Sequence, residues 1–529
     1  MGSEVGTVQA LAEVVQVPFA GSRACFESLL DYAQSGEVGR MRHSDLEREL
    51  EERGRELMRT MFQELLDSRS SAQAREPVRG ADGLPRTRKR LQERDLESVF
   101  GTVQVTRVGY GRDGEESLHP LDAELNLPER RYSHELERRL AEEVAKTSFE
   151  EAVRTVEKQT GDLVPKRQVE ELARRAARDF DAFYGQRQAE VPGVSSSLVV
   201  TTMDGKGVVM RREDLREATR KAAERRLHKL SKRLSKGEKR NAKRMAMVAS
   251  VYTIAPVVRT AEDIVRGLTG VGAADEPATS KAPRPRPEHK RVWASLAKSP
   301  EQAIEESFKE AARRDPQGEK KWVALVDGNE TQLRLLHQVA ERLGIVVTVV
   351  LDIVHVAQYL WAAALAFHGE GSAERELWVA ERLTDVLRGR ASLVASGMRR
   401  SATLRGLTYK QRKAVDRCAG YLLRNKAYLR YDEYLAAGFP VATGVIEGAC
   451  RHLVKDRMDI TGARWSLAGA DAVLQLRALR ASGDFDDYWR FHEDQEYQRN
   501  HVARYVDGEV PAVDKPGRTR RQTHLRIVK

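Results

Sequence analysis

The feature that most constrains the fold of this chain is a pair of apolar runs, each of which ends on an aspartate. Residues 198–204 read LVVTTMD, and residues 322–327 read WVALVD. Uninterrupted runs of this kind are typical of strands that are buried on both faces, as in sheets covered by helices. A carboxylate at the end of such a strand is held by rigid backbone, which makes it a suitable ligand for a hard metal ion.

The residues after the first aspartate have two interpretations. The sequence Gly205-Lys206-Gly207 predicts a tight turn, followed by a returning strand at residues 208–210. Asp204 is then either a metal ligand or an ordinary hairpin residue, because aspartate starts many turns that have no further function. This stretch alone leaves both interpretations open.

The regular elements after residue 197 predict an α/β fold. The pattern indicates, in order, a strand hairpin at 198–210, a strand at 245–258, a helix at 300–314, a strand at 322–326, a helix at 330–343 and a strand at 345–350. This is the order of a ribonuclease H-like domain, whose partly parallel sheet is covered by helices. Residues 356–440 show only helical periodicity, and their length predicts an all-α insertion.

The candidate catalytic and metal-binding residues are three carboxylates, Asp204, Asp327 and Glu447. In a ribonuclease H-like sheet the first and fourth strands are neighbours, so the two aspartates converge, and Glu447 comes from a later helix. Oxygen ligands without cysteine or clustered histidine favour Mg²⁺ or Mn²⁺. Two such ions, roughly 3.5–4 Å apart, can activate a water or a 3′-hydroxyl and stabilise the leaving oxygen in phosphodiester chemistry.

The charge balance predicts a polyanionic partner, for which DNA is the usual candidate. The chain has 90 Lys and Arg against 79 Asp and Glu, a formal net charge of +11. The most basic stretch, residues 216–244, has a thin apolar stripe, so we expect an exposed helix whose Lys232, Arg233 and Lys236 contact phosphates. A solvated linker helix is the alternative.

Three short helices over residues 134–185 outline a helix-turn-helix, with a glycine-containing turn before a basic last helix. Lys166, Arg167 and Gln168 lie at the N-terminal end of that last helix, where side chains would face bases. Ordinary helical packing gives the same outline. The basic segment 86–94 before the predicted β-ribbon is likewise either a solvated face or a phosphate contact.

The remaining patterns set the expected domains. An apolar stripe in the helical residues 26–69 favours a core-facing helix over a free coiled coil; it consists of Leu46, Leu50, Leu57, Met61 and Leu65. The predicted domains are a helical N-terminal region (1–95), a β-ribbon and helix-turn-helix region (96–190), a catalytic core in two parts (191–355 and 441–485) around the all-α insertion (356–440), and a polar, basic tail (486–529).

Cysteine usage and hydropathy exclude several classes of protein. Cys25, Cys418 and Cys450 are far apart and form no Cys-x-x-Cys pair, which excludes a zinc ribbon and makes a reducing cytoplasm the expectation. Cys450 is expected to be a small buried residue, not a nucleophile. We expect neither a signal peptide nor a membrane partner, because no run approaches the roughly 18 apolar residues of a membrane span.

Longer motifs surround the three carboxylates. VVTTMDGKGV contains Asp204, WVALVDGNE contains Asp327, and ATGVIEGACRHLVKDRMDITGARWS contains Glu447, with LDIVHVAQYLW between the last two. Together with PLDAELNLPERRYS and ASGDFDDYWRFH, these motifs resemble the DDE transposases of bacterial insertion sequences. The resemblance is greatest to the Kra-type family, which is related to the Mutator-like transposases of eukaryotes.

The resemblance implies roles for these residues. Asp204, Asp327 and Glu447 would be the catalytic triad, and Asp352 and His355, in an Asp-x-x-His signature, would support the site. Residues expected to contact DNA near the site are Lys206, Arg451, Arg464 and Trp465, although Arg464 and Trp465 are also explained as a helix cap. The implied activity is cleavage at terminal inverted repeats and transfer of the freed strand into target DNA by at least a dimer.

Two other functions are compatible with the same residues. The first is a ribonuclease H-like nuclease that hydrolyses DNA without strand transfer. The second is an inactive, transposase-derived DNA-binding protein, against which the presence of all three carboxylates argues.

Overall fold

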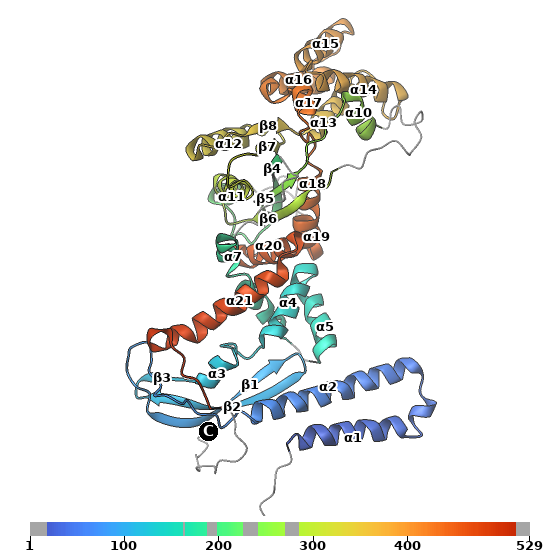
Figure 1. The fold of residues 1–529 in the computed structure, drawn as a ribbon. Helices are drawn as coiled ribbons and strands as arrows, with labels where there is room; N and C mark the ends of the chain where they lie inside the picture. The colour runs from blue at the N-terminus through green and yellow to red at the C-terminus, as the bar shows by residue number, and fades with distance from the viewer. Residues whose placement is uncertain (1–17, 162–163, 188–197, 226–241, 270–284, 515–529) are drawn as a thin grey trace, which may run out of the picture. The chain divides into compact units, whose positions relative to one another are not determined.

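The computed structural model describes residues 18–161, 164–187, 198–225, 242–269 and 285–514 (Figure 1). They form two compact units. The N-terminal unit comprises the described residues up to Val144, Phe149–Leu172 and those from Trp489 onward, and the central unit comprises Ala145–Ser148 and Ala173–Tyr488. No helix of the described residues combines the length and the apolar character needed to cross a bilayer.

The N-terminal unit contains a three-stranded antiparallel sheet in the order β1-β2-β3. Its strands are β1 (Arg88–Ser98), β2 (Gly101–Arg112) and β3 (Glu115–Leu118). The predicted ribbon is therefore present, but the basic segment 86–94 belongs largely to its first strand and is not a separate solvated face. One face of the sheet holds Leu96, Val103 and Val105, which pack with Leu66 in a core.

A helical pair precedes this sheet, formed by α1 (Ala20–Gln34) and α2 (His43–Asp67). The helical prediction for residues 26–69 is confirmed apart from the break between the two helices. The prediction that the apolar stripe of α2 faces a core is wrong over much of its length, since Leu50 is 46% and Leu65 43% exposed. α2 packs against α1 and β2, which leaves much of its stripe uncovered.

The three predicted helices between residues 134 and 185 are confirmed. They are α4 (His134–Lys146), α5 (Phe149–Thr160) and α6 (Lys166–Ala176), and they follow the short α3 (Pro120–Glu124) and precede α7 (Phe180–Gln186). Their amphipathic spacing explains their formation, because α5 buries Ala152, Val153 and Val156 on one face.

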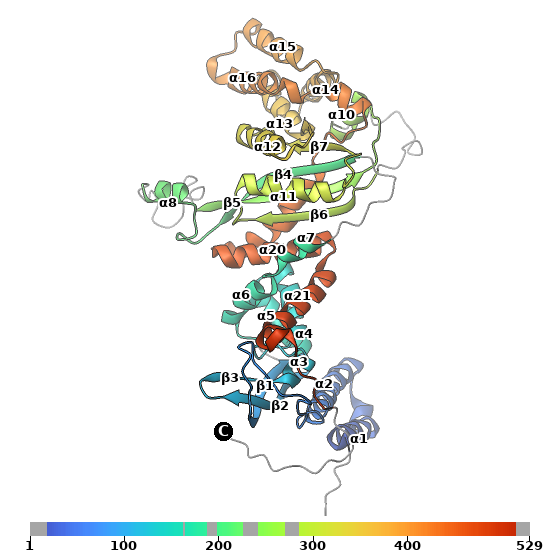
Figure 2. The ribbon, with the colours of Figure 1, turned by 60° about the vertical axis from the view of Figure 1, so that its left-hand side comes forward.

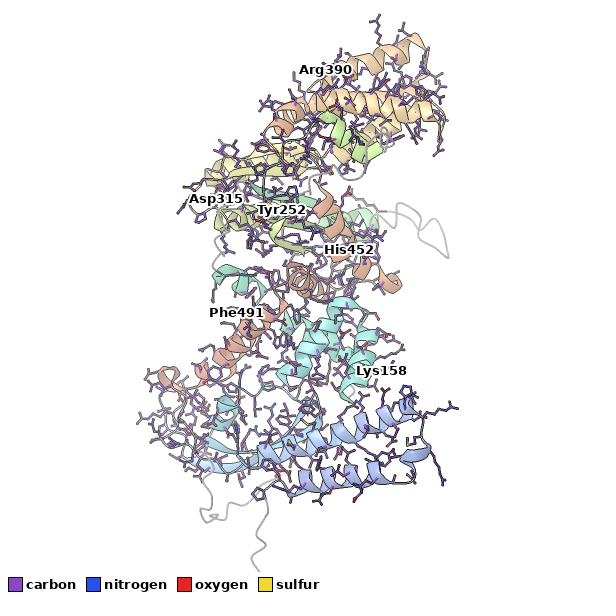
Figure 3. All side chains as sticks on the ribbon, turned by 45° about the vertical axis from the view of Figure 1, so that its right-hand side comes forward. Lys158, Tyr252, Asp315, Arg390, His452 and Phe491 are labelled. Atoms are coloured by element: carbon purple, nitrogen blue, oxygen red, sulfur yellow. The ribbon has the colours of Figure 1, made fainter. Side chains whose placement is uncertain are left out.

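The central unit is an α/β structure built on a mixed sheet in the order β6-β5-β4-β7-β8. The strands are β4 (Leu198–Val209), β5 (Lys243–Ile254), β6 (Glu288–Ser295), β7 (Lys321–Val326) and β8 (Thr348–Leu351). β4, β5 and β6 pair antiparallel, whereas β4 and β7, and β7 and β8, pair parallel. Val200, Val323 and Val350 are completely buried, and Tyr252 of β5, labelled in Figure 3, is also in this core.

The sheet is covered on both faces. Thr201 of β4 donates to the Ser307 hydroxyl of α11 (Pro300–Arg313) at 3.1 Å, whereas Asp204 of β4 contacts Cys450, just after α18 (Gly444–Ala449). Successive side chains of a strand point to opposite faces, so α11 and α18 lie on different faces of the sheet. Figure 1 shows them on either side of the strands.

The turn predicted at Gly205-Lys206-Gly207 is absent. β4 continues in register with β5 as far as Val209 opposite Lys243, so Asp204 lies within a strand. Close packing against side chains of β5 explains why these two positions are glycines. A Cβ at Gly205 would lie 3.1 Å from Met245 Cε, and one at Gly207 would lie 3.0 Å from Lys243 Cδ.

The predicted hairpin was expected to contribute two strands to the sheet, but residues 198–209 form the single strand β4. The additional strand of the sheet is β6, which was not predicted. The first half of β6, Glu-His-Lys-Arg, has no apolar run, and its buried part begins at Arg291. The helix α10 (Ala261–Thr269) was also missed. Residues 273–289 contain the Pro-rich, basic sequence KAPRPRPEH, which is typical of an exposed linker, and they lie mostly outside the described residues.

Two helices follow the parallel strands β7 and β8. α12 (Glu330–Leu343) connects β7 to β8, and α13 (Ile353–Ala364) leaves β8. The predicted all-α insertion is confirmed and continues through α14 (Ala373–Leu387), α15 (Ala391–Leu404), α16 (Tyr409–Arg424) and α17 (Tyr431–Ala436). These helices gather on the β7–β8 side of the sheet, away from β6 (Figure 2).

After the insertion the chain returns to the sheet. α18 continues into a π-helical stretch, Cys450–Lys455, and then into α19 (Asp456–Met458) and α20 (Leu467–Ser482). The end of the predicted polar tail (486–529) lies outside the described residues, and its start forms the helix α21 (Phe485–Asn500). Its first turn buries Phe485, Tyr488 and Trp489, which gives this segment the apolar contacts that a loose tail lacks.

Candidate functional site

Asp204 and Asp327 lie at equivalent register positions of neighbouring parallel strands. Thr202 of β4 stands opposite Leu325 of β7, and each aspartate comes two residues further along its strand direction. Because paired residues of parallel strands lie side by side, this register brings both aspartates to the level at which β7 ends, while β4 continues to Val209. Ligands of open α/β sheets bind in this position.

Local hydrogen bonds orient both aspartates. Asp204 Oδ1 accepts from its neighbour Gly205 N at 2.6 Å, and Asp204 Oδ2 accepts from Cys450 Sγ at 3.3 Å. Asp327 Oδ1 accepts from Asn329 N at 2.9 Å, while the Tyr421 hydroxyl donates to the Asp327 carbonyl at 3.0 Å. Each carboxylate is therefore held by groups close to it and is only partly buried.

Glu447 lies on α18, which packs against β4 and β5. Its side chain is exposed. Cys450 connects it to Asp204: burial, followed by the charge and hydrogen bond of Asp204 and the charge of Glu447, raises the pKa of the Cys450 thiol. Asp204 contacts this thiol, and Glu447 precedes it by three residues in the chain. The π-helical stretch begins at Cys450, and such stretches are rare and frequent at functional sites.

The donor set suits hard cations. Asp204, Asp327 and Glu447 offer carboxylate oxygens, and among the described residues none of the three forms a salt bridge that would neutralise it. The ligand atoms of the three do not all lie within 4.8 Å of one another. This spacing is too open for one ion held by all three residues.

Asp352 connects the end of β8 to the start of α18. It is completely buried and caps α13, where its Oδ1 accepts from Val354 N at 3.0 Å. The same oxygen accepts from Thr443 N at 3.3 Å, and the Thr443 hydroxyl donates to Oδ2. Thr443 immediately precedes α18. Asp352 is thus in a position to fix that helix, and His355 lies partly buried one turn further along α13.

The residues predicted to contact DNA near the site differ in how far their side chains are exposed. Arg451 and Arg464 are exposed, and Lys206 is partly buried on β4. Trp465 is only 5% exposed, and its indole N–H donates to the Met458 carbonyl at 3.1 Å. Stacking of Trp465 on DNA is therefore not available, and its ring has the structural role that was the alternative.

The predicted helix-turn-helix contacts lie at the start of α6 and are exposed. Lys166 pairs with Glu150 at 2.9 Å, and Gln168 accepts from the Tyr132 hydroxyl, so Arg167 has the fewest competing contacts of the three. Lys232, Arg233 and Lys236 lie outside the described residues.

A basic groove beside Glu447 was missed by the sequence analysis. It has a volume of about 640 Å³ and runs along the face of α18 that holds Gly444 and Gly448. Its cationic lining consists of Arg286, Lys290, Arg477 and Arg480, with His452, which Figure 3 labels, and no carboxylate is among its described lining residues. Arg286 and Lys290 precede or begin β6 whereas Arg477 and Arg480 lie on α20, so only the folded chain brings them together.

Comparisons with known proteins give little similarity. No family model matches the chain, and no curated protein matches it in sequence. A solved structure of the Drosophila P element transposase strand transfer complex matches over 70% of this chain and 82% of that chain, with 9% identity and a TM-score of 0.22. At this TM-score the likeness carries no argument about fold or function.

Proposed function

We propose that this chain is a DDE transposase of an insertion sequence, with a ribonuclease H-like catalytic core and Asp204, Asp327 and Glu447 as its catalytic carboxylates. The observation that carries the proposal is the register of β4 and β7, which brings two aspartates from apolar strands to the level at which β7 ends. The strand order and directions are those expected of a ribonuclease H-like sheet.

The third carboxylate, Glu447, would join the two aspartates from a helix far along the chain. α18 packs on β4 and β5, and Cys450, three residues after Glu447, contacts Asp204. An all-α insertion separates the second aspartate from this helix in sequence, as the resemblance to DDE transposases implies. The motifs around the three residues therefore support the proposal independently of the sheet.

The residues present fit divalent ions. Asp204, Asp327 and Glu447 would hold Mg²⁺ or Mn²⁺ through carboxylate oxygens, and bound ions would supply activation of the attacking oxygen and stabilisation of the leaving one. Asp204 is oriented for this by Gly205 N and Cys450 Sγ, and Asp327 by Asn329 N. Asp352 holds the start of the Glu447 helix through Thr443.

The substrate is double-stranded DNA, at the element's terminal inverted repeats and at a target site. The basic groove beside α18 supports this, because its arginine and lysine residues offer phosphate contacts next to the acidic cluster. Arg167 and the other exposed residues at the start of α6 would contribute to end recognition. Joining two ends in one complex requires at least a dimer.

The test uses a donor plasmid that carries the gene with its natural flanking DNA, a target plasmid and the purified full chain. We expect Mg²⁺- or Mn²⁺-dependent cleavage at the element ends and joined products with pre-cleaved 3′-hydroxyl ends. Asp204→Asn, Asp327→Asn and Glu447→Gln should each reduce both reactions to background while end binding persists. Glu374→Gln, an exposed carboxylate of α14, is the matched control and should retain activity.

The outcomes separate the three candidate functions. Cleavage without joined products would identify a nuclease that lacks strand transfer. Specific binding of the ends without cleavage by the wild-type chain would identify an inactive DNA-binding protein. Full cleavage by Glu447→Gln would remove Glu447 from the triad.

A further inference from the structure

The N-terminal unit contains a cavity of about 330 Å³ that is separate from the carboxylate site. It lies over one face of the three-stranded sheet. Gln92 stands opposite Arg107 in the β1–β2 register, and Arg94 is two residues from Gln92, so these three side chains share that face. α3 and residues 500–505 complete the wall.

Arg107 is a buried guanidinium with an unused donor. It is 8% exposed, and its Nε lies 2.8 Å from Asp122 Oδ1. Its Nη1 is also buried and has no hydrogen-bond partner. Leaving a buried donor unsatisfied costs roughly 1–3 kcal/mol, and more for a charged group, so a ligand atom that accepts from Nη1 would be bound favourably.

Two further arginines line the cavity, and its described lining also includes three carboxylates, the buried Asp122 and the exposed Glu116 and Glu129. Arg94 is half-buried and donates to the backbone carbonyl of Arg130, with no carboxylate partner among the described residues. Arg504 pairs with Glu116 at 3.1 Å, but the Glu116 side chain is 92% exposed, which makes this pair weak. Asp122 is the single buried carboxylate among the described lining residues, against three guanidinium groups.

Two neutral polar side chains, Gln92 and His119, also line the cavity. Burial, together with the charges of Arg107, Arg504 and Arg94, lowers the pKa of His119 to about 3, so its imidazole is uncharged at neutral pH. His119 Nε2 contacts Gln92 Oε1. Gly109 makes this contact possible, since a Cβ there would lie 2.8 Å from Gln92 Oε1 and 3.0 Å from His119 Nε2. Hydrogen-bonding groups without negative charge therefore adjoin the arginines.

We propose that this cavity binds a phosphomonoester, with Arg94, Arg107 and Arg504 contacting the phosphate. Guanidinium groups match the oxygens of phosphate in charge and geometry. Small-molecule sites span roughly 300–1,000 Å³, so this cavity accommodates a phosphate with a small attached group, and a double helix is too large for it. The phosphate is that of a mononucleotide-sized molecule or of a 5′-phosphorylated strand end. The proposal does not depend on the transposase assignment.

The test measures binding to the full chain by isothermal titration calorimetry at constant ionic strength. The probes are inorganic phosphate, adenosine monophosphate, and one short single strand prepared with and without a 5′-phosphate. We expect phosphate and adenosine monophosphate to bind competitively, and Arg94→Gln to weaken both at least tenfold. Arg88→Gln is the matched control, because Arg88 lies on the same strand, outside the cavity, and pairs with the exposed Asp113.

The strand pair distinguishes the two sources of the phosphate. Competition with inorganic phosphate by the phosphorylated strand alone would assign the cavity to strand ends, whereas competition by adenosine monophosphate but neither strand would assign it to small molecules. Arg504→Gln provides a second variant if Arg94→Gln does not fold. Three results would overturn the proposal: no binding beyond that of chloride, equal binding by wild type and both arginine variants, or displacement of inorganic phosphate to the same extent by the strand with and the strand without a 5′-phosphate.

Discussion

Cys450 donates its thiol hydrogen to Asp204 at 3.3 Å, although 246 positions separate the two residues in the chain. This contact joins the helical segment of Glu447 to the strand of the first aspartate. The Cys450 side chain is buried, so it contributes packing as well as the hydrogen bond. We therefore expect the contributions of Cys450 and Asp204 to the free energy of unfolding to be coupled.

We predict a coupling energy of about 0.5–1.5 kcal/mol between Cys450 and Asp204, because a hydrogen bond in a partly buried place contributes this much. The measurement is a double-mutant cycle of Cys450→Ala and Asp204→Ala by denaturant unfolding. Cys418, a buried cysteine of α16, supplies the control pair. Cys418→Ala and Asp204→Ala should be additive within about 0.5 kcal/mol, and additivity for Cys450 as well would show that the contact contributes nothing.

Replacing Asp352 should destabilise the central unit. We expect Asp352→Asn to lower the free energy of unfolding by about 1–3 kcal/mol, because the buried carboxylate caps α13 and accepts from Thr443. Asp416→Asn, on the surface of α16, should change it by less than about 0.5 kcal/mol. Equal stability of the two variants would show that Asp352 does not anchor the start of α18.

Gly438 should not tolerate a side chain. Its φ is +74°, and an added Cβ would lie 2.7 Å from Val257 N and 2.8 Å from Pro256 Cβ. We expect Gly438→Ala to reduce stability by more than about 2 kcal/mol, since both the backbone conformation and the contact are unfavourable. Gly397→Ala, in α15 with no atom within 4 Å, should instead be neutral or stabilising by up to about 1 kcal/mol. Thermal unfolding of the two variants makes the comparison.

Glu310 should make the central unit sensitive to acid. Burial opposes its ionisation, but the charges of Arg291 and Arg314 outweigh burial and lower its pKa to about 2. The folded pKa is below the unfolded one, so the stabilisation is complete above about pH 4.5 and is lost as pH falls towards 2. We expect a loss on the order of 3 kcal/mol over this range.

The comparison of variants isolates this contribution. Glu310→Gln should flatten the decline of stability between pH 4.5 and 2 relative to wild type. Glu305→Gln, on the same helix but only partly buried, should keep most of that decline. An identical acid profile for wild type and Glu310→Gln would contradict the assignment of the low pKa to Glu310.

The fold was predictable where the sequence has long apolar or periodic runs. β4, β7 and β8 are buried on both faces, and Val200, Val323 and Val350 make their signal unambiguous. β6 escaped prediction because its first residues are charged and its buried half includes Arg291, whose burial depends on Glu306 and Glu310 from α11. Gly205 and Gly207 led to the wrong prediction of a turn. The reason for these glycines is their close packing against side chains of β5, which the local sequence does not reveal.

The same division holds for the candidate site. Asp204 and Asp327 could be predicted because each follows an apolar run in the sequence. Glu447 could be predicted from the motif around it. The contact of Cys450 with Asp204 and the junction of Asp352 with Thr443 both join segments about a hundred or more residues apart, so no local pattern reports them. The burial of Trp465 was not predicted either; its indole N–H donates to the Met458 carbonyl, and the Arg457 guanidinium lies over its ring.

The distance along the chain between Asp204 and Glu447 also has a consequence during biosynthesis. Translation adds roughly 5–20 residues per second, so the 447 − 204 = 243 positions between them correspond to about 12–50 s. During that interval a growing chain carries Asp204 and, in the later part, Asp327 as well, but not α18. The acidic cluster is completed only when the insertion has been made, which ties its assembly to nearly full-length synthesis.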